Sequence, residues 1–220
     1  MRFKAVGFDI DGTLYANYKM YFHSLPSGLF HPVLAWNFGK VRKDIRKIRP
    51  VEHFRHLQAK LLSKRMNMQP DHTFALMERF LYQTWETSFK GIKPLKNVKE
   101  VLNDLKERGI LLGALSDFPV KKKLEYLGLK DVWDVAFTSE DTNYLKPHPE
   151  PFLALAQGFG VEPGEVLYVG NSYKYDVIGA RSVGMKTAHY SKRPHPNTLA
   201  DYTFFDYKDL RDFVVNKSGI

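Results

Sequence analysis

Apolar residues in this chain form short, nearly continuous runs separated by segments with helical spacing. Runs of this kind are typical of strands that are covered on both faces of a sheet. They predict strands over 3–9, 110–115, 134–138, 166–170 and 185–189, with a short edge strand over 203–205.

Helical patterns lie between these strands. Residues 98–108 carry apolar side chains at positions 98, 101, 102 and 105, and a glycine follows as a stop signal. Similar patterns predict helices over 119–127, 149–159, 173–183 and 208–215. Strands that alternate with helices form βαβ units. We therefore expect an α/β fold with a doubly wound, Rossmann-like parallel sheet.

One segment interrupts the alternation. Residues 18–93, called the insert below, lack strong strand signals and contain helical stretches such as 54–66 and 72–88. We expect two parts: an α/β core formed by 1–17 and 94–220, and a small all-helical insert formed by 18–93.

Composition narrows the class of protein. The chain has 220 residues, of which 44% are hydrophobic and 26% charged, which is typical of a globular protein. No apolar run approaches the roughly 20 residues of a membrane span, so no membrane partner is expected. The absence of cysteine excludes disulfide and thiolate chemistry and agrees with a cytoplasmic location.

The positive charge is concentrated in the insert. The net charge is +9, and the stretch 40–65 alone holds ten Lys or Arg against two acids, which is +8. Such a stretch is usually a solvated helical face, but it also attracts anionic substrates or nucleic acid. No nucleic-acid-binding motif accompanies it, so a nucleic-acid partner is not favoured.

Polar residues follow the predicted strands at their carboxyl ends, where ligands bind in doubly wound folds. In chain order they are Asp9, Asp11, Thr13, Ser116, Lys146, Asn171 and Asp176.

This set of side chains suits phosphoryl transfer. Asp9 can attack phosphorus as a nucleophile, and Asp11 can act as the general acid and base. Thr13, Ser116 and Lys146 can bind the phosphate oxygens, where charge lies in the transition state. Clustered carboxylates would repel the phosphate, and a magnesium ion would neutralise that charge.

Four motifs in order give the chain a resemblance to a known family. They read FDIDGTLY (8–15), LSD (115–117), YLKPHPEPF (144–152) and VGNSYKYDVIGA (169–180). The core therefore resembles the haloacid dehalogenase-like hydrolases, and the insert stands where members of this family carry a helical cap.

The resemblance implies specific roles. Asp9 would be the nucleophile and Asp11 the acid and base, with the main-chain carbonyl of Asp11 as a ligand of Mg²⁺. Ser116 and Lys146 would hold the phosphate. The metal ligands would be Asp9 and Asp11 with Asn171 and Asp176 of the fourth motif.

The fourth motif departs from the family pattern. The family usually has Gly-Asp-Ser where this chain has Gly170, Asn171 and Ser172. Asparagine keeps an oxygen that can bind Mg²⁺ but loses a negative charge. Either metal affinity is weaker than in typical members, or Asp176 carries more of the ligation.

The function that we expect is a Mg²⁺-dependent phosphomonoester hydrolase that forms an aspartyl-phosphate and acts on a small phosphorylated metabolite. A phosphotransferase such as a sugar phosphomutase would use the same core. A non-catalytic protein that binds anions or nucleic acid is a further alternative. A dehalogenase is disfavoured because that branch lacks a carboxyl at the position of Asp11. Asp117 is interpreted as structural.

Overall fold

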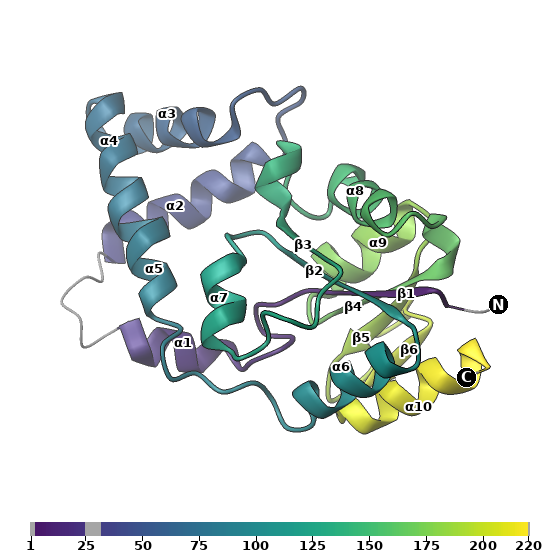
Figure 1. Ribbon diagram of the computed structural model, residues 1–220. Coiled ribbons are helices and arrows are strands. Elements are labelled where there is room, and N and C mark those ends of the chain that lie inside the picture. Colours follow the sequence, from purple (N-terminus) through teal and green to yellow (C-terminus); the bar gives the residue numbers. More distant parts are fainter. Residues whose placement is uncertain (1–2, 25–31, 220) are drawn as a thin grey trace.

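The computed structural model describes residues 3–24 and 32–219 and shows a six-stranded, all-parallel sheet with helices on both faces (Figure 1). The expected doubly wound fold is confirmed. Across the sheet the strands are β3 (Val135–Thr138), β2 (Leu111–Ser116), β1 (Ala5–Phe8), β4 (Val166–Gly170), β5 (Lys186–Tyr190) and β6 (Tyr202–Phe204).

Strand order reverses at the centre of the sheet, between β1 and β4. Phe8, the last residue of β1, pairs with Ala114 on one side and with Val169 on the other. The carboxyl ends of β1, β2 and β4 therefore lie side by side. This is the place where open α/β sheets bind ligands.

Two layers of helices cover the sheet. On one face pack α6 (Val98–Glu107), α7 (Lys121–Tyr126) and α10 (Tyr207–Ser218), and on the other pack α8 (Pro149–Phe159) and α9 (Ile178–Ser182) (Figure 1). The near-continuous apolar strands are explained by this double coverage.

Glycines in the central strands let α8 approach the sheet. A Cβ at Gly7 would lie 2.5 Å from Leu155 Cδ2, and one at Gly113 would lie 2.4 Å from Phe159 Cζ. Both distances are far below van der Waals contact. Gly7 and Gly113 therefore make room for Leu155 and Phe159 of α8.

The insert is helical, as expected. Its helices are α1 (Asn17–Ser24, which begins one residue before the insert), α2 (Pro32–Ile45), α3 (Phe54–Met66), α4 (Pro70–Leu76), a π-helix η1 (Met77–Gln83) and α5 (Thr84–Thr87). Its residues 25–31 lie outside the described part of the chain. Leu34, Phe38, Leu62 and Met77 belong to an apolar cluster that is separate from the two clusters on the sheet.

Two predicted helices are not regular. The expected helix over 72–88 contains η1, and the expected helix over 173–183 begins as a π-helix, η4 (Tyr173–Val177), before α9. Apolar spacing does not distinguish the two hydrogen-bonding patterns, because both place side chains on a helical face.

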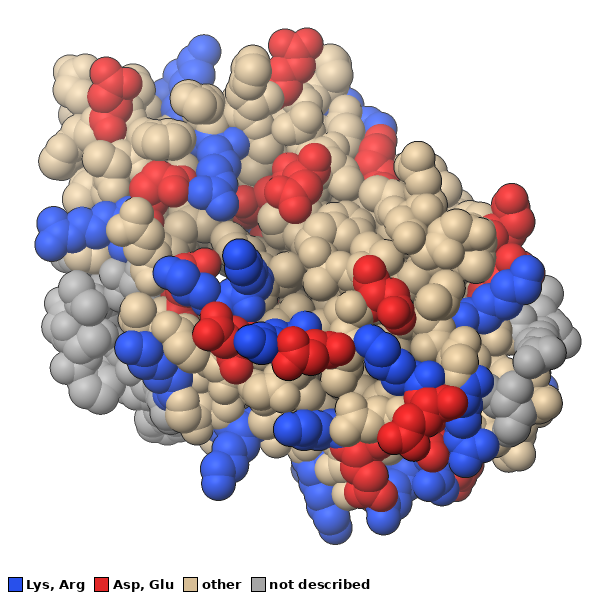
Figure 2. Space-filling model, in the orientation of Figure 1, with Lys and Arg blue, Asp and Glu red and all other residues tan. Residues whose placement is uncertain are grey.

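The basic stretch 40–65 is only partly a solvated face. Lys40, Lys47 and Lys60 are exposed as expected, but Arg42 is only 5% exposed and Arg46 is half-buried against the core. For these two arginines the expectation of a solvated face is wrong, because each meets carboxylates or carbonyls of the core. On the face drawn in Figure 2, positive side chains lie among negative ones rather than in a separate patch.

Within the described residues, no helix combines the length and the apolar character that crossing a membrane requires.

Candidate active site

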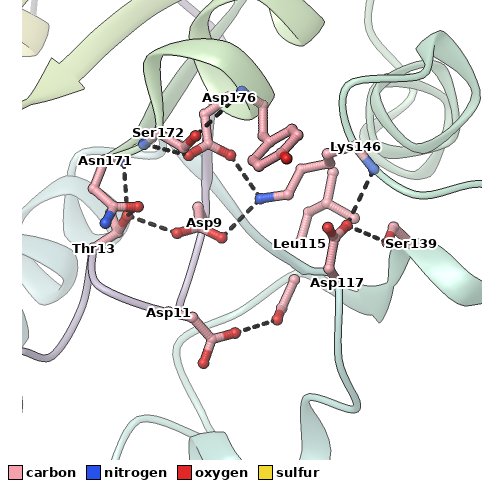
Figure 3. Close-up of polar contacts among 12 residues, drawn as sticks. Asp9, Asp11, Thr13, Leu115, Asp117, Ser139, Lys146, Asn171, Ser172 and Asp176 are labelled. Carbon is pink, nitrogen blue, oxygen red and sulfur yellow. Dashed lines mark hydrogen bonds and ion pairs between the residues drawn. The ribbon is translucent and has the colours of Figure 1, made fainter. Parts of the chain in front are cut away.

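Asp9 directly follows β1 and is held by two donors. Its main-chain N–H donates to the carbonyl of Val169 at 2.8 Å, which continues the β1–β4 ladder. One carboxylate oxygen accepts from the Thr13 hydroxyl at 2.7 Å, and the other accepts from Lys146 Nζ at 2.7 Å (Figure 3). Asp9 is 5% exposed. It is therefore a buried but fully partnered carboxylate.

The turn after Asp9 requires glycine. Gly12 has φ +85°, a left-handed conformation that favours glycine, and a Cβ there would lie 2.3 Å from Asn171 Nδ2. The turn brings Thr13 against the loop that follows β4. There Thr13 Oγ1 accepts from the Asn171 N–H at 3.0 Å and lies 3.4 Å from Asn171 Oδ1.

Lys146 connects two carboxylates. Its ammonium lies 2.7 Å from Asp9 Oδ1 and 2.7 Å from Asp176 Oδ1 (Figure 3). It also donates to the Tyr168 hydroxyl at 3.2 Å. Lys146 and Asp176 are 3% and 1% exposed. The sequence analysis did not single out Tyr168, which lies on β4 and gave no signal beyond that of an apolar strand residue.

The loop after β4 presents Asp176 to this lysine. The Ser172 hydroxyl accepts from the N–H of Tyr175, and the Ser172 N–H donates to Asp176 Oδ2 at 2.9 Å. A Cβ at Gly170 would lie 2.4 Å from Asp176 Cβ. The glycine therefore lets the Asp176 side chain pack against the end of β4.

Asp11 belongs to a second cluster. Its carboxylate accepts from Ser116 Oγ at 2.6 Å, from the Tyr15 hydroxyl at 2.5 Å, and from Lys123 Nζ at 2.6 and 2.9 Å. Lys123 also donates to Ser116 Oγ at 3.1 Å. In Figure 3 the Asp11 carboxylate lies apart from the chain of contacts through Asp9.

All seven predicted residues thus gather at one edge of the sheet, in two hydrogen-bonded groups. Asp9, Thr13, Lys146, Asn171 and Asp176 form the first group. Asp11 and Ser116 form the second with two residues that the sequence analysis missed, Tyr15 and Lys123.

No local signal separates Lys123 from its neighbours. It is the last of three consecutive lysines, and its Lys121 and Lys122 neighbours are exposed whereas Lys123 is 1% exposed. A buried ammonium is tolerated only with a compensating charge. The carboxylate of Asp11, more than 100 residues earlier in the chain, supplies that charge.

Opposing effects set the ionisation of these groups. Burial, together with the charges of Asp176 and Asp11, raises the pKa of Asp9 to about 7 against the opposing effect of Lys146. Burial would raise the pKa of Asp11 as well, but Lys123 and the hydrogen bonds to it hold that pKa below its usual value. Burial disfavours charge on Lys146, yet Asp176 and Asp9 keep its pKa well above the ordinary range.

The oxygen atoms at this edge suit a hard divalent cation. Among the described residues no three His, Cys, Asp or Glu side chains gather as a metal site would require. The available donors are the carboxylates of Asp9 and Asp176, Oδ1 of Asn171, and the main-chain carbonyl of Asp11. Oxygen donors of these types are those that Mg²⁺ takes, although the set has fewer charges than a site with three carboxylates.

Comparison with known proteins agrees with the fold and with the position of this site on the sheet. The profile of the family described as haloacid dehalogenase-like hydrolase matches residues 6–190, which is most of the chain. The chain belongs to the haloacid dehalogenase-like hydrolases. The resemblance carried by the four motifs is confirmed, and the protein is an enzyme of the hydrolase type.

Curated relatives of this hydrolase align with most of its length. The phosphoglycolate phosphatase of Mannheimia succiniciproducens is 28% identical, with 97% of this chain and 99% of the relative aligned. The glyceraldehyde 3-phosphate phosphatase of Methanopyrus kandleri is 31% identical, with 84% and 82% aligned. The solved structure of a HAD phosphatase from Thermococcus onnurineus is similar, with a TM-score of 0.66, 27% identity, and 96% and 97% covered.

Proposed function

We propose that this hydrolase is a phosphatase that transfers the phosphoryl group of a small phosphomonoester to Asp9 and then to water. The observation that carries the proposal is the buried Asp9 carboxylate, with Lys146 at 2.7 Å, at the carboxyl end of the central strand. The curated relatives named above support it, since both are named as phosphatases.

The chemistry needs two displacements at phosphorus. A carboxylate oxygen of Asp9 forms a bond to phosphorus while the ester P–O bond breaks, and the departing alkoxide takes a proton from Asp11, which enters this step protonated and leaves it ionised. Water then attacks the aspartyl-phosphate and gives its proton to Asp11. Inorganic phosphate leaves, and the Asp9 carboxylate is restored.

Asp11 is held in the form that the second displacement needs. Lys123, Ser116 and Tyr15 all donate to it and lower its pKa, so they favour the ionised form that Asp11 takes once it has given its proton to the leaving group. An ionised carboxylate can accept the proton of the attacking water.

Lys146 and Ser116 would bind the phosphoryl oxygens, where negative charge lies in the transition state. Thr13 instead orients Asp9 through its hydroxyl. Mg²⁺ bound by Asp9, the Asp11 carbonyl, Asn171 and Asp176 would neutralise charge between the carboxylates and the phosphate.

We further propose that residues 18–93 act as a cap over a core formed by 1–17 and 94–220. In Figure 1 the helices α2–α5 lie on the side of the molecule where the carboxyl ends of the strands point. A cap at this edge can exclude water from the phosphoryl group and select the substrate.

A substrate screen tests the proposal. The purified protein is assayed with Mg²⁺ against p-nitrophenyl phosphate and a library of phosphorylated metabolites, with Asp9→Asn as the blank. Phosphate release by the wild type and not by the blank is the expected result. Inactivity of the wild type on every substrate would refute a phosphatase, and phosphate transfer to a sugar instead of water would indicate a phosphotransferase.

A further inference from the structure

The main chain of Lys146 is held from both sides. Its N–H donates to Asp117 Oδ1 at 3.1 Å, and its carbonyl accepts from Arg46 Nε at 2.6 Å. Asp117 and Arg46 also form an ion pair through Asp117 Oδ2 and Arg46 Nη2. The three residues close a ring of contacts around the peptide that carries the Lys146 side chain.

Arg46 comes from the insert, whereas the other two members of the ring come from the core. It lies in the turn directly after α2, and its Nη1 donates to the carbonyl of Arg42 at 2.7 Å. Its guanidinium also lies over the ring of Tyr175, 4.5 Å from the centroid, next to Asp176 in sequence. One side chain of the insert therefore touches both core segments that flank Asp9.

The nitrogen atoms of Arg46 are committed to protein groups. Nε, Nη1 and Nη2 each donate to a named acceptor, and the charge is balanced by Asp117. Arg46 therefore holds protein groups in place and has no nitrogen atom left over to bind the substrate directly.

We propose that Arg46 is a positioning residue for Lys146, so that the insert completes the phosphate-binding site only when α2 is docked on the core. The inference rests on the proposed function, because it takes Lys146 as a phosphate-binding group. Its physical basis is that the Lys146 ammonium must reach a point 2.7 Å from both Asp9 and Asp176, which leaves little tolerance for movement of its backbone.

The chain offers a matched control, Arg49. It also joins the insert to the core, through an ion pair with Glu150, a contact of Nη1 with His148 Nδ1 at 3.1 Å and a cation–π contact with Tyr144 at 4.6 Å. The contacts of Arg49 do not include Lys146. Removing Arg49 therefore removes one link between insert and core but leaves both hydrogen bonds to the Lys146 main chain in place.

Steady-state kinetics with p-nitrophenyl phosphate separate the roles of Arg46 and Arg49. We expect Arg46→Ala to lower kcat about 100-fold with KM changed by less than about threefold, because a misplacement of about 1 Å can cost this much. Arg49→Ala is expected to stay within about threefold of wild type in both constants. Equal losses in the two variants, or a rise in KM alone for Arg46→Ala, would overturn the proposal.

Hydrogen exchange gives a readout that does not depend on activity. In Arg46→Ala the amide of Lys146 should exchange faster, measured by mass spectrometry on a peptide that spans it, and in Arg49→Ala it should not. If Arg46→Ala does not fold, Arg46→Lys and Asp117→Asn replace it with the same expected direction. Unchanged exchange of the Lys146 amide and unchanged kcat in these variants would refute a positioning role for Arg46. An inactive wild type with the expected exchange pattern would refute only the proposed phosphatase activity.

Discussion

The ion pair between Arg42 and Glu140 allows a quantitative prediction about stability. Arg42 Nη1 lies 2.6 Å from Glu140 Oε1, and the two side chains are 6% and 3% exposed. Arg42 also donates to Gln58 at 3.2 Å and to the carbonyl of Asp117. We choose Arg42→Met, which keeps an apolar stem in place while removing the charge.

Loss of the guanidinium would leave Glu140 buried with weaker partners. The Tyr82 hydroxyl remains at 2.9 Å, and Arg55 Nε is 3.5 Å away. Removing one member of a buried pair costs about 3–5 kcal/mol, because the remaining charge is desolvated without compensation. For a chain of this size each kcal/mol lowers Tm by about 2–4 °C, so we expect a fall of roughly 6–20 °C.

Thermal and urea unfolding followed by circular dichroism measure this effect. The control is Lys47→Met, which removes an exposed partner of Asp44 at 3.5 Å and should cost less than about 1 kcal/mol. Replacing both Arg42 and Glu140 by apolar residues should recover much of the loss, since no buried charge is then left. A loss below about 1 kcal/mol in Arg42→Met would show that this ion pair does not hold the insert to the core.

Three further outcomes are expected. Asn171→Asp should lower the Mg²⁺ concentration for half-maximal turnover by at least about tenfold, because a unit charge about 4 Å from the ion contributes several kcal/mol. An unchanged Mg²⁺ dependence would contradict the assignment of residue 171 as a metal ligand. Gly170→Ala should slow turnover and cost about 1–3 kcal/mol, since its Cβ would displace Asp176, whereas Gly164→Ala, with open space around its Cβ, should be neutral in both assays. In metal-free protein the pKa of Asp9 is raised to about 7, so the folded state binds this proton more tightly than the unfolded state does. The resulting contribution to the free energy of unfolding is fully present below about pH 4 and is lost as pH rises through 7. Urea unfolding in EDTA should therefore show Asp9→Asn more stable than wild type at pH 8 but not at pH 4, and equal curves at pH 8 would refute the raised pKa.

Much of the core could be read from the sequence because its signals are local. Continuous apolar runs mark doubly covered strands, and the order of strands and helices restricts the topology to a parallel sheet. Parallel strands end at the same edge, so residues that follow separate strands, such as Asp9, Lys146 and Asp176, could be expected to meet. The structure brings them within hydrogen-bonding distance.

The tertiary structure alone decided which charged residues support that site. Lys123 looks like its exposed neighbours, and Arg42 and Arg46 look like the rest of a solvated basic stretch. Lys123 and Arg42 are buried and Arg46 is half-buried, because a carboxylate from a distant segment lies opposite each of them, and no spacing along the chain encodes such a pairing. The sequence by itself determined the sheet and the polar residues at its edge. Only tertiary packing, within the core for Lys123 and between insert and core for Arg42 and Arg46, decided which cations are brought against distant carboxylates.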